Sequence, residues 1–112
     1  MSKITFNKNG DICIIQLFGH LNDTLEANLA LGVKKHLSEG CRKFVFDFTS
    51  VDMLDSPAIA ALLDTTETVV NEEKGKISFA GLNSLCRKVL EMVGFYMYAD
   101  VHESVQDAID KI

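Results

Sequence analysis

Short apolar runs alternate along the chain with longer stretches in which apolar residues recur every three or four positions. The runs are typical of buried strands, and the spaced positions are typical of amphipathic helices. Strands are expected at 3–8, 12–18, 43–48, 76–80 and 95–99, and helical stripes run through Leu25–Leu37, Ile59–Val70, Leu85–Val93 and Val105–Ile112. Asn9-Gly10 is a two-residue hairpin signal between the first two strands.

The resulting element order, β-β-α-β-α-β-α-β-α, predicts an α/β fold. Strands that alternate with helices form a mainly parallel sheet, because each helix returns the chain to the same end of the sheet. The opening hairpin makes the first strand an antiparallel edge strand. No linker, repeat or low-complexity tract interrupts the pattern, so residues 1–112 are expected to form a single domain.

Residues that favour helix starts precede the predicted helices. Asp23 and Glu26 have capping-box spacing before the first helix, and Asp100 and Glu103 repeat it before the last. The third helix is expected to begin at a cap supplied by Asn83 or Ser84, both before an apolar stripe.

The second helix begins at Ser56-Pro57. Proline is favoured at the first helical position, because its missing N–H would have no partner there and its φ is already helical. Ser56 is therefore the expected N-cap, with its hydroxyl accepting from the backbone N–H of Ala58 or Ile59.

Composition and charge restrict the function. The chain of 112 residues has a net charge of −5, which disfavours binding to nucleic acid or to an anionic membrane surface. No apolar run approaches the roughly 18 residues of a membrane span, so no direct membrane insertion is expected. The first ten residues lack the apolar core of a signal peptide, and we expect a cytoplasmic protein.

The cysteines and histidines do not form a recognisable metal or redox motif. Cys13 lies in an apolar run and is expected in the core, whereas Cys41 and Cys86 are expected to be partly exposed. The histidines have no metal-ligand spacing, and no C-x-x-C pair is present. We therefore predict neither a metal site nor a cofactor.

Four aspartates form the only cluster with catalytic potential. Asp47, Asp52 and Asp55 surround the turn before the second helix, and Asp23 should lie at the same edge of the sheet. Clustered carboxylates can bind magnesium or act as acid and base, but acidic residues at helix starts are also favoured by the helix dipole. The sequence contains no nucleotide-binding glycine motif and no recognisable nucleophile–base pair, so the prediction is a protein that is not an enzyme.

The residues of this turn are more typical of a protein-binding surface than of a catalytic site. The start of a helix offers unpaired N–H groups and tolerates an anion, so Ser56 is a possible phosphorylation site as well as a cap. Met53 either adds an apolar contact to this surface or fills the edge of the sheet beneath the turn. The residues expected to bind a partner are Asp23, Asp52, Met53, Asp55, Ser56, Pro57 and Asp64.

The stretch FVFDFTSVDMLDSPAIAALL resembles the signature of the STAS domain, which occurs in anti-sigma factor antagonists and sulfate transporters. The signature places an Asp in an apolar strand, then a Ser or Thr, and ends in an Asp-Ser turn; Phe46–Val51 and Leu54–Ser56 match it. Weaker matches lie at Gly19–Leu21, Phe79–Leu82 and Val89–Phe95. The resemblance covers essentially the whole chain.

This resemblance implies a partner-switching regulator of transcription. In such proteins a kinase that is also an anti-sigma factor phosphorylates a Ser or Thr in the turn, which breaks their complex, and a phosphatase restores it. Ser56 is the matching residue here. Three positions depart from the pattern: Pro57 replaces a Ser or Thr, Ala58 replaces a Gly, and Asn22 replaces an Asp.

Two other functions stay open at this stage. One is a STAS scaffold subunit of a signalling or transporter complex that is never phosphorylated. The other is a sensor that binds a small ligand or nucleotide at the edge formed by Asp23 and Asp55. The sequence leaves the partner and the oligomeric state undetermined, with a homo-oligomer among the alternatives.

Overall fold

The computed structural model describes residues 3–112 and confirms the predicted order of strands and helices. A π-helical turn (η1, Thr68–Glu72) extends α2, and a 3-10 turn (η2, Phe95–Met97) precedes the last strand. The main elements are β1 (Lys3–Asn9), β2 (Ile12–Leu21), α1 (Leu25–Ser38), β3 (Lys43–Leu54), α2 (Ser56–Glu67), β4 (Lys76–Ala80), α3 (Ser84–Met92), β5 (Asp100–His102) and α4 (Val105–Lys111).

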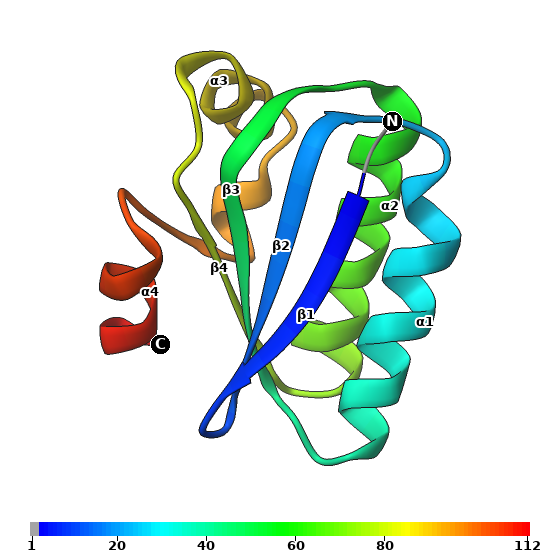
Figure 1. Ribbon diagram of the computed structural model, residues 1–112, viewed down its shortest axis with the longest axis vertical. Coiled ribbons are helices and arrows are strands. Elements are labelled where there is room, and N and C mark those ends of the chain that lie inside the picture. The colour runs from blue at the N-terminus through cyan, green and yellow to red at the C-terminus, as the bar shows by residue number, and fades with distance from the viewer. Residues whose placement is uncertain (1–2) are drawn as a thin grey trace.

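The five strands form one mixed sheet in which the strand order equals the order in the sequence, β1-β2-β3-β4-β5. β1 pairs antiparallel with β2, and the remaining neighbours pair in parallel. The α/β fold with a mainly parallel sheet and an antiparallel first edge strand is therefore confirmed. The parallel strands bring their carboxyl ends to one edge, which is where the α1 and α2 starts also lie (Figure 1).

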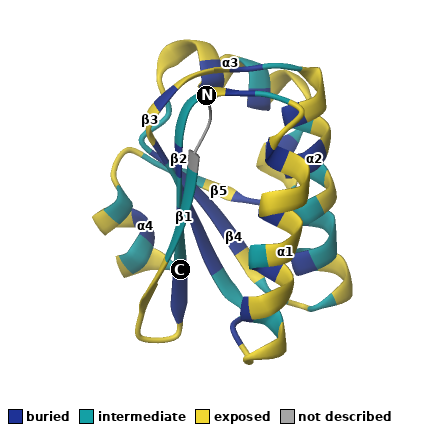
Figure 2. Ribbon diagram, turned by 45° about the vertical axis from the view of Figure 1, so that its right-hand side comes forward, coloured by how far each residue is buried: buried dark blue, intermediate teal, exposed yellow. Residues whose placement is uncertain are grey.

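Helices cover the two faces of the sheet unequally. α1 and α2 lie side by side against one face, and the short α4 lies against the other (Figures 1 and 2). The large core lies under α1, α2 and α3 and includes Phe44, Phe46 and Phe48 of β3. The smaller core under α4 is formed by Ile12, Val45, Ala80 and Ala108.

β1 packs tightly against α1 through a glycine. The ring of Phe6 lies over Gly32, where an added Cβ would come within 2.0 Å of Phe6 Cζ. The same ring stacks on His36 at a centroid distance of 5.4 Å, and His36 Nδ1 lies 2.8 Å from the Gly32 carbonyl oxygen. The absence of a side chain at Gly32 therefore lets the edge strand approach the helix backbone.

Two predicted strand boundaries are wrong. β3 does not end at Phe48 but continues to Leu54, because its last residues pair with β2; Val51 pairs with Gly19, and Leu54 pairs with Leu21. Residues 95–99 do not form the last strand. Gly94 adopts a left-handed φ of 82°, and the chain then makes the η2 turn before pairing with β4 from Asp100.

Two predicted helix caps are also wrong. Asp23 does not cap α1; instead the side-chain oxygen of Asn22 accepts from the N–H of Thr24 at 3.0 Å and from its hydroxyl at 2.7 Å. Asp100 does not cap α4, because it already belongs to β5, and the hydroxyl of Ser104 accepts from the N–H of Asp107. For α3 the structure selects Asn83 from the two predicted caps.

All three cysteines are buried free thiols. This confirms the prediction for Cys13 and contradicts it for Cys41 and Cys86, which are 4% and 0% exposed. Burial, followed by the nearby Cys41, raises the pKa of the Cys13 thiol to about 12. Burial, followed by the charge of Asp52, also raises the pKa of Cys86. Thiols held protonated in this way are poor nucleophiles.

Candidate functional site

The ends of β2 and β3 and the start of α2 form one edge of the molecule. Leu21 and Leu54 are the last paired residues of the two strands, and the N–H of Asp55 donates to the Leu21 carbonyl oxygen at 3.0 Å. The residues that follow each strand, Asn22–Asp23 and Asp55–Ser56, therefore leave the sheet at the same place. This agrees with the expectation that Asp23 and Asp55 share an edge.

Asp55, not Ser56, caps α2. Its backbone is extended (φ −101°, ψ 179°), and its Oδ1 accepts from the N–H of Ala58 at 3.2 Å. An aspartate satisfies this role well, because its charge also complements the helix dipole. Ser56 is consequently the first helical residue and Pro57 the second, so α2 begins one residue earlier than the sequence predicted.

The displacement of the cap leaves the Ser56 hydroxyl unused. Both Ser56 and Pro57 are exposed, and within residues 3–112 the Ser56 side chain makes no hydrogen bond or ion pair. A hydroxyl at the first helical position lies beside backbone N–H groups that have no partner inside the helix. Ser56 is thus accessible to another protein, and the partial positive charge at the start of the helix would stabilise an anion there.

His20 faces this site from β2, which the sequence did not indicate. Its Nε2 lies 3.8 Å from Asp55 Oδ2, while the other oxygen of Asp55 holds the helix cap. The two side chains are 53% and 40% exposed, so solvent weakens the ion pair that a protonated His20 would form. Local sequence does not predict this contact, because it depends on the pairing of His20 with Met53 across β2 and β3.

Asn83 connects the start of α3 to the segment before the site. Its Oδ1 accepts from the N–H of Cys86 at 2.8 Å, and its Nδ2 donates to the carbonyl oxygens of Val51 and Asp52 at 3.1 and 3.0 Å. The sequence indicated the cap but not the two bonds to β3, which span more than thirty residues. Asn83 therefore holds the end of β3 in place from the neighbouring helix.

Two residues near the end of β3, just before the buried Leu54, are exposed. Asp52 is exposed, and Met53 is 42% exposed. Of the two interpretations of Met53, the structure supports the exposed one. Together with Asp55, Ser56 and Pro57, these two residues form a continuous stretch of chain, which we call the switch edge (residues 52–57).

The four aspartates do not converge on a metal site. Asp47 instead organises the strand before the switch edge: its Oδ1 accepts from the N–H and the hydroxyl of Thr49 at 2.9 and 2.6 Å. Gly81 packs against this turn, where an added Cβ would lie 2.5 Å from Thr49 Oγ1. Among residues 3–112, no group of three or more His, Cys, Asp or Glu side chains is placed to hold a metal ion.

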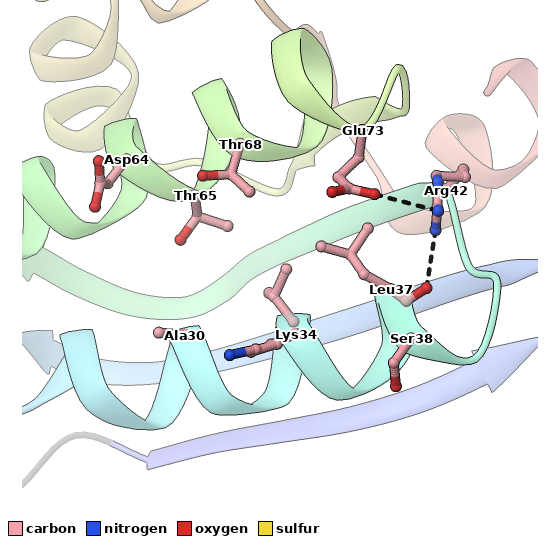
Figure 3. Close-up of a pocket in the computed structure, with 10 residues that line it drawn as sticks. Ala30, Lys34, Leu37, Ser38, Arg42, Asp64, Thr65, Thr68 and Glu73 are labelled. Carbon is pink, nitrogen blue, oxygen red and sulfur yellow. Dashed lines mark hydrogen bonds and ion pairs between the residues drawn. The ribbon is translucent and has the colours of Figure 1, made fainter.

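Asp64 lies apart from the other predicted partner-binding residues. It is on α2, eight residues after Ser56, which is about 12 Å along a helix. There it lines a cavity between α1 and α2 (Figure 3). Asp23 is exposed on the other side of the shared edge, before α1.

Solved structures with the same fold cover nearly the whole chain. The Thermotoga maritima protein TM1081 has 14% sequence identity and a TM-score of 0.86, with 97% of this chain and 93% of that chain covered. The phosphorylated form of SpoIIAA, a Bacillus cell fate determinant, has 16% identity and a TM-score of 0.77, with 97% and 98% covered. A sulfate transporter family protein from Wolinella succinogenes has 17% identity and a TM-score of 0.80, with 93% and 86% covered.

The sequence itself matches the profile of one family. None of the curated proteins matches it individually. Within residues 3–112, no helix combines the length and apolarity needed to cross a bilayer. The profile of the STAS domain matches residues 3–108, nearly the full length of the chain. The matched range contains the Asp-Ser turn of the switch edge. The chain therefore belongs to the STAS domain family.

Proposed function

We propose that this protein is a cytoplasmic anti-sigma factor antagonist that acts by partner switching at Ser56. Its partners are an anti-sigma factor with serine kinase activity and a phosphatase that restores the free hydroxyl. The protein acts by binding and not as an enzyme. The family match and the similar fold of SpoIIAA, which has been solved in unphosphorylated and phosphorylated forms, support this proposal.

The observation that carries the proposal is the unused, exposed hydroxyl at the start of α2. Because Asp55 supplies the cap, phosphorylation of Ser56 would not remove a bond on which the helix depends. The helix dipole stabilises the added phosphate, so the switch edge stays folded in both states.

The phosphate would nevertheless change how the edge meets a partner. It adds about −1.5 to −2 charges beside Asp52 and Asp55. A partner surface that fits a neutral hydroxyl and the exposed Met53 would then face a bulky, strongly hydrated anion. Loss of the complex follows from repulsion and desolvation at the interface and does not require a change of fold.

Phosphopeptide mapping of the protein isolated from its native cells tests the proposal first. We expect phosphate on Ser56 in an amount that changes with growth and stress conditions. Ser56→Asp should lose its partner in a pull-down, whereas Ser56→Ala should stay bound in the presence of kinase and ATP. Binding by Ser56→Asp at the wild-type level would contradict the switch.

Ser84 provides a matched control. It is also an exposed serine at the first position of a helix, after the cap Asn83, so Ser84→Asp places the same charge in an equivalent helix start. We expect this variant to keep the partner. Asp55→Ala separates folding from binding, because loss of the true cap should cost about 0.5–2 kcal/mol of stability, whereas Ser56→Ala should cost little.

A STAS subunit of a larger complex is the second proposal. The similar fold of the Wolinella sulfate transporter family protein and the Pro57 that follows Ser56 favour it. In that case Ser56 would be unmodified under every condition, and the switch edge would stay docked. Native complexes that contain this chain with a bare Ser56 would support this second function.

A further inference from the structure

A cavity of about 650 Å³ lies between α1 and α2, away from the switch edge (Figure 3). Its volume falls within the range of about 300–1,000 Å³ that small-molecule sites occupy. Its lining includes Val33, Lys34 and Leu37 from α1, and Asp64, Thr65 and Thr68 from α2 and the turn that extends it.

One end of the cavity is closed by an arginine. Arg42 Nη2 pairs with Glu73 Oε1 at 3.2 Å, and Nη1 donates to the carbonyl oxygens of Leu37 and Cys41, both at 2.9 Å. These bonds tie the end of α1 to the segment after α2 (Figure 3). The charges of Arg42 and Glu73 are therefore already compensated.

The other end carries two opposite charges that have no partner. Lys34 extends from α1, and Asp64 extends from the facing side of α2 (Figure 3). Neither forms an ion pair or hydrogen bond with any residue of the described range 3–112. The hydroxyls of Thr65 and Thr68 also have no partner in that range and lie on the same side of α2 as Asp64.

The remaining wall is aliphatic, because Ala30, Val33 and Leu37 follow one another along α1. With respect to residues 3–112, the cavity thus combines an apolar surface with one free cation, one free anion and two free hydroxyls. A simple anion would meet the carboxylate of Asp64 as well as Lys34, and a metal cation would meet the ammonium of Lys34 as well as Asp64. The balance of charges favours a ligand that itself carries one charge of each sign.

From this arrangement we propose that the cavity between α1 and α2 binds a small aliphatic zwitterion of amino-acid or short-peptide type. Its carboxylate pairs with Lys34, its ammonium pairs with Asp64, and its aliphatic side chain lies on Val33 and Leu37. Thr65 and Thr68 supply hydrogen bonds to its polar backbone. This site is separate from Ser56 and does not depend on the proposed partner switch.

Titration of the isotope-labelled chain with leucine and with the dipeptide leucyl-leucine tests the site by NMR. We expect shifts confined to amides of residues 30–38 and 64–68. The difference in affinity between the two probes identifies the free amino acid or the peptide as the preferred form. The N-acetyl and amide derivatives, which each lack one charge, should bind roughly tenfold more weakly or worse.

Two variants locate the charges. Lys34→Gln and Asp64→Asn should each weaken binding of the zwitterion by roughly tenfold or more. Lys34→Gln should bind the amide derivative, which lacks the carboxylate, no more weakly than the zwitterion. Asp64→Asn should likewise bind the N-acetyl derivative, which lacks the ammonium, no more weakly than the zwitterion. Lys35→Gln is the matched control, since Lys35 is exposed on the same helix but does not line the cavity. Well-dispersed spectra of all three variants establish that they are folded.

Three results would overturn the proposal. The first is that neither probe shifts any resonance at millimolar concentration, the second is that the shifts lie outside the two segments, and the third is that the blocked derivatives bind as well as the zwitterions. The last result would indicate simple partitioning of an aliphatic group. None of these results bears on phosphorylation of Ser56, so failure here is distinguishable from failure of the proposed function.

Discussion

The two faces of the sheet differ in how much core they carry. Among residues 3–112, the face under α1, α2 and α3 buries aromatic rings and long aliphatic side chains, whereas the core under α4 contains four buried apolar residues (Figure 2). β3 shows the contrast within one strand: Phe44, Phe46 and Phe48 point to the first face, and Val45 points to the second. Most of the stability should therefore come from one side of the molecule.

The second face is also partly polar. Thr5, Gln16 and Asp47 form a row across β1, β2 and β3, with Thr5 Oγ1 donating to Gln16 Oε1 at 3.0 Å and Gln16 Nε2 donating to Asp47 Oδ2 at 3.4 Å. These side chains are only half-buried, because α4 has seven residues and leaves that part of the sheet open to solvent. The contrast leads to four predictions.

Truncation of Phe79 on the large face should have the largest effect. The ring is fully buried and contacts Phe46, Phe48 and Phe95 at centroid distances of 5.4, 5.7 and 5.5 Å. We expect Phe79→Ala to lower the free energy of unfolding by about 3–5 kcal/mol, because it removes these contacts and leaves a cavity. Urea denaturation measures this decrease. A decrease no larger than that of a typical surface substitution would contradict the view that the large face supplies most of the stability.

The buried thiol of Cys13, in the core of the large face, should make stability depend on pH in the alkaline range. The ordinary pKa of 9.0 applies to Cys13 in the unfolded chain, and burial raises it to about 12 in the folded protein. Between these values the folded state binds more protons, so the free energy of unfolding should fall as the pH rises from 9 to 12.

Cys13→Ala isolates this contribution. The variant lacks the thiol but keeps every other group that titrates in alkali, so its stability should fall less steeply over the same pH range. Denaturation curves for both proteins at several pH values measure the two slopes. Equal slopes would show that Cys13 does not contribute to the alkaline loss of stability.

On the small face, Ile109 of α4 should matter less than Phe79. It is partly exposed and packs against the smaller core. We expect Ile109→Ala to lower the free energy of unfolding by about 1 kcal/mol, because this side chain buries less apolar surface than Phe79 does. A cost equal to that of Phe79→Ala would abolish the proposed difference between the faces.

The smallest effects should come from two buried hydroxyls, one near each core. Thr66 of α2 and Ser78 of β4 are 0% and 1% exposed, and neither hydroxyl has a hydrogen-bond partner in the part of the chain that the structure describes. Thr66→Val and Ser78→Ala should leave stability unchanged or raise it by up to about 1 kcal/mol, because an unpaired polar group is removed from the interior. Thermal denaturation measures the stability of both variants. A clear loss of stability in either variant would indicate that the hydroxyl makes a hydrogen bond and would contradict this prediction.

Local patterns were sufficient to predict the element order and most of the core. They failed where a distant segment decides the outcome. Residues 49–54 look like a turn, yet pairing with β2 extends them as strand, and the same pairing draws Asp55 into the cap position. The bonds from Asn83 to β3 and the approach of His20 to Asp55 likewise depend on the assembled sheet.

The order of the strands in the sheet also describes how the chain can be assembled. Because β1 to β5 are neighbours in the order in which a ribosome makes them, each strand joins an edge that already exists. No strand has to be inserted between two earlier ones, and the first pairing is a tight hairpin. The nascent chain can therefore grow its sheet outward from the β1–β2 hairpin, and each later strand has to close only the single helical crossover that precedes it.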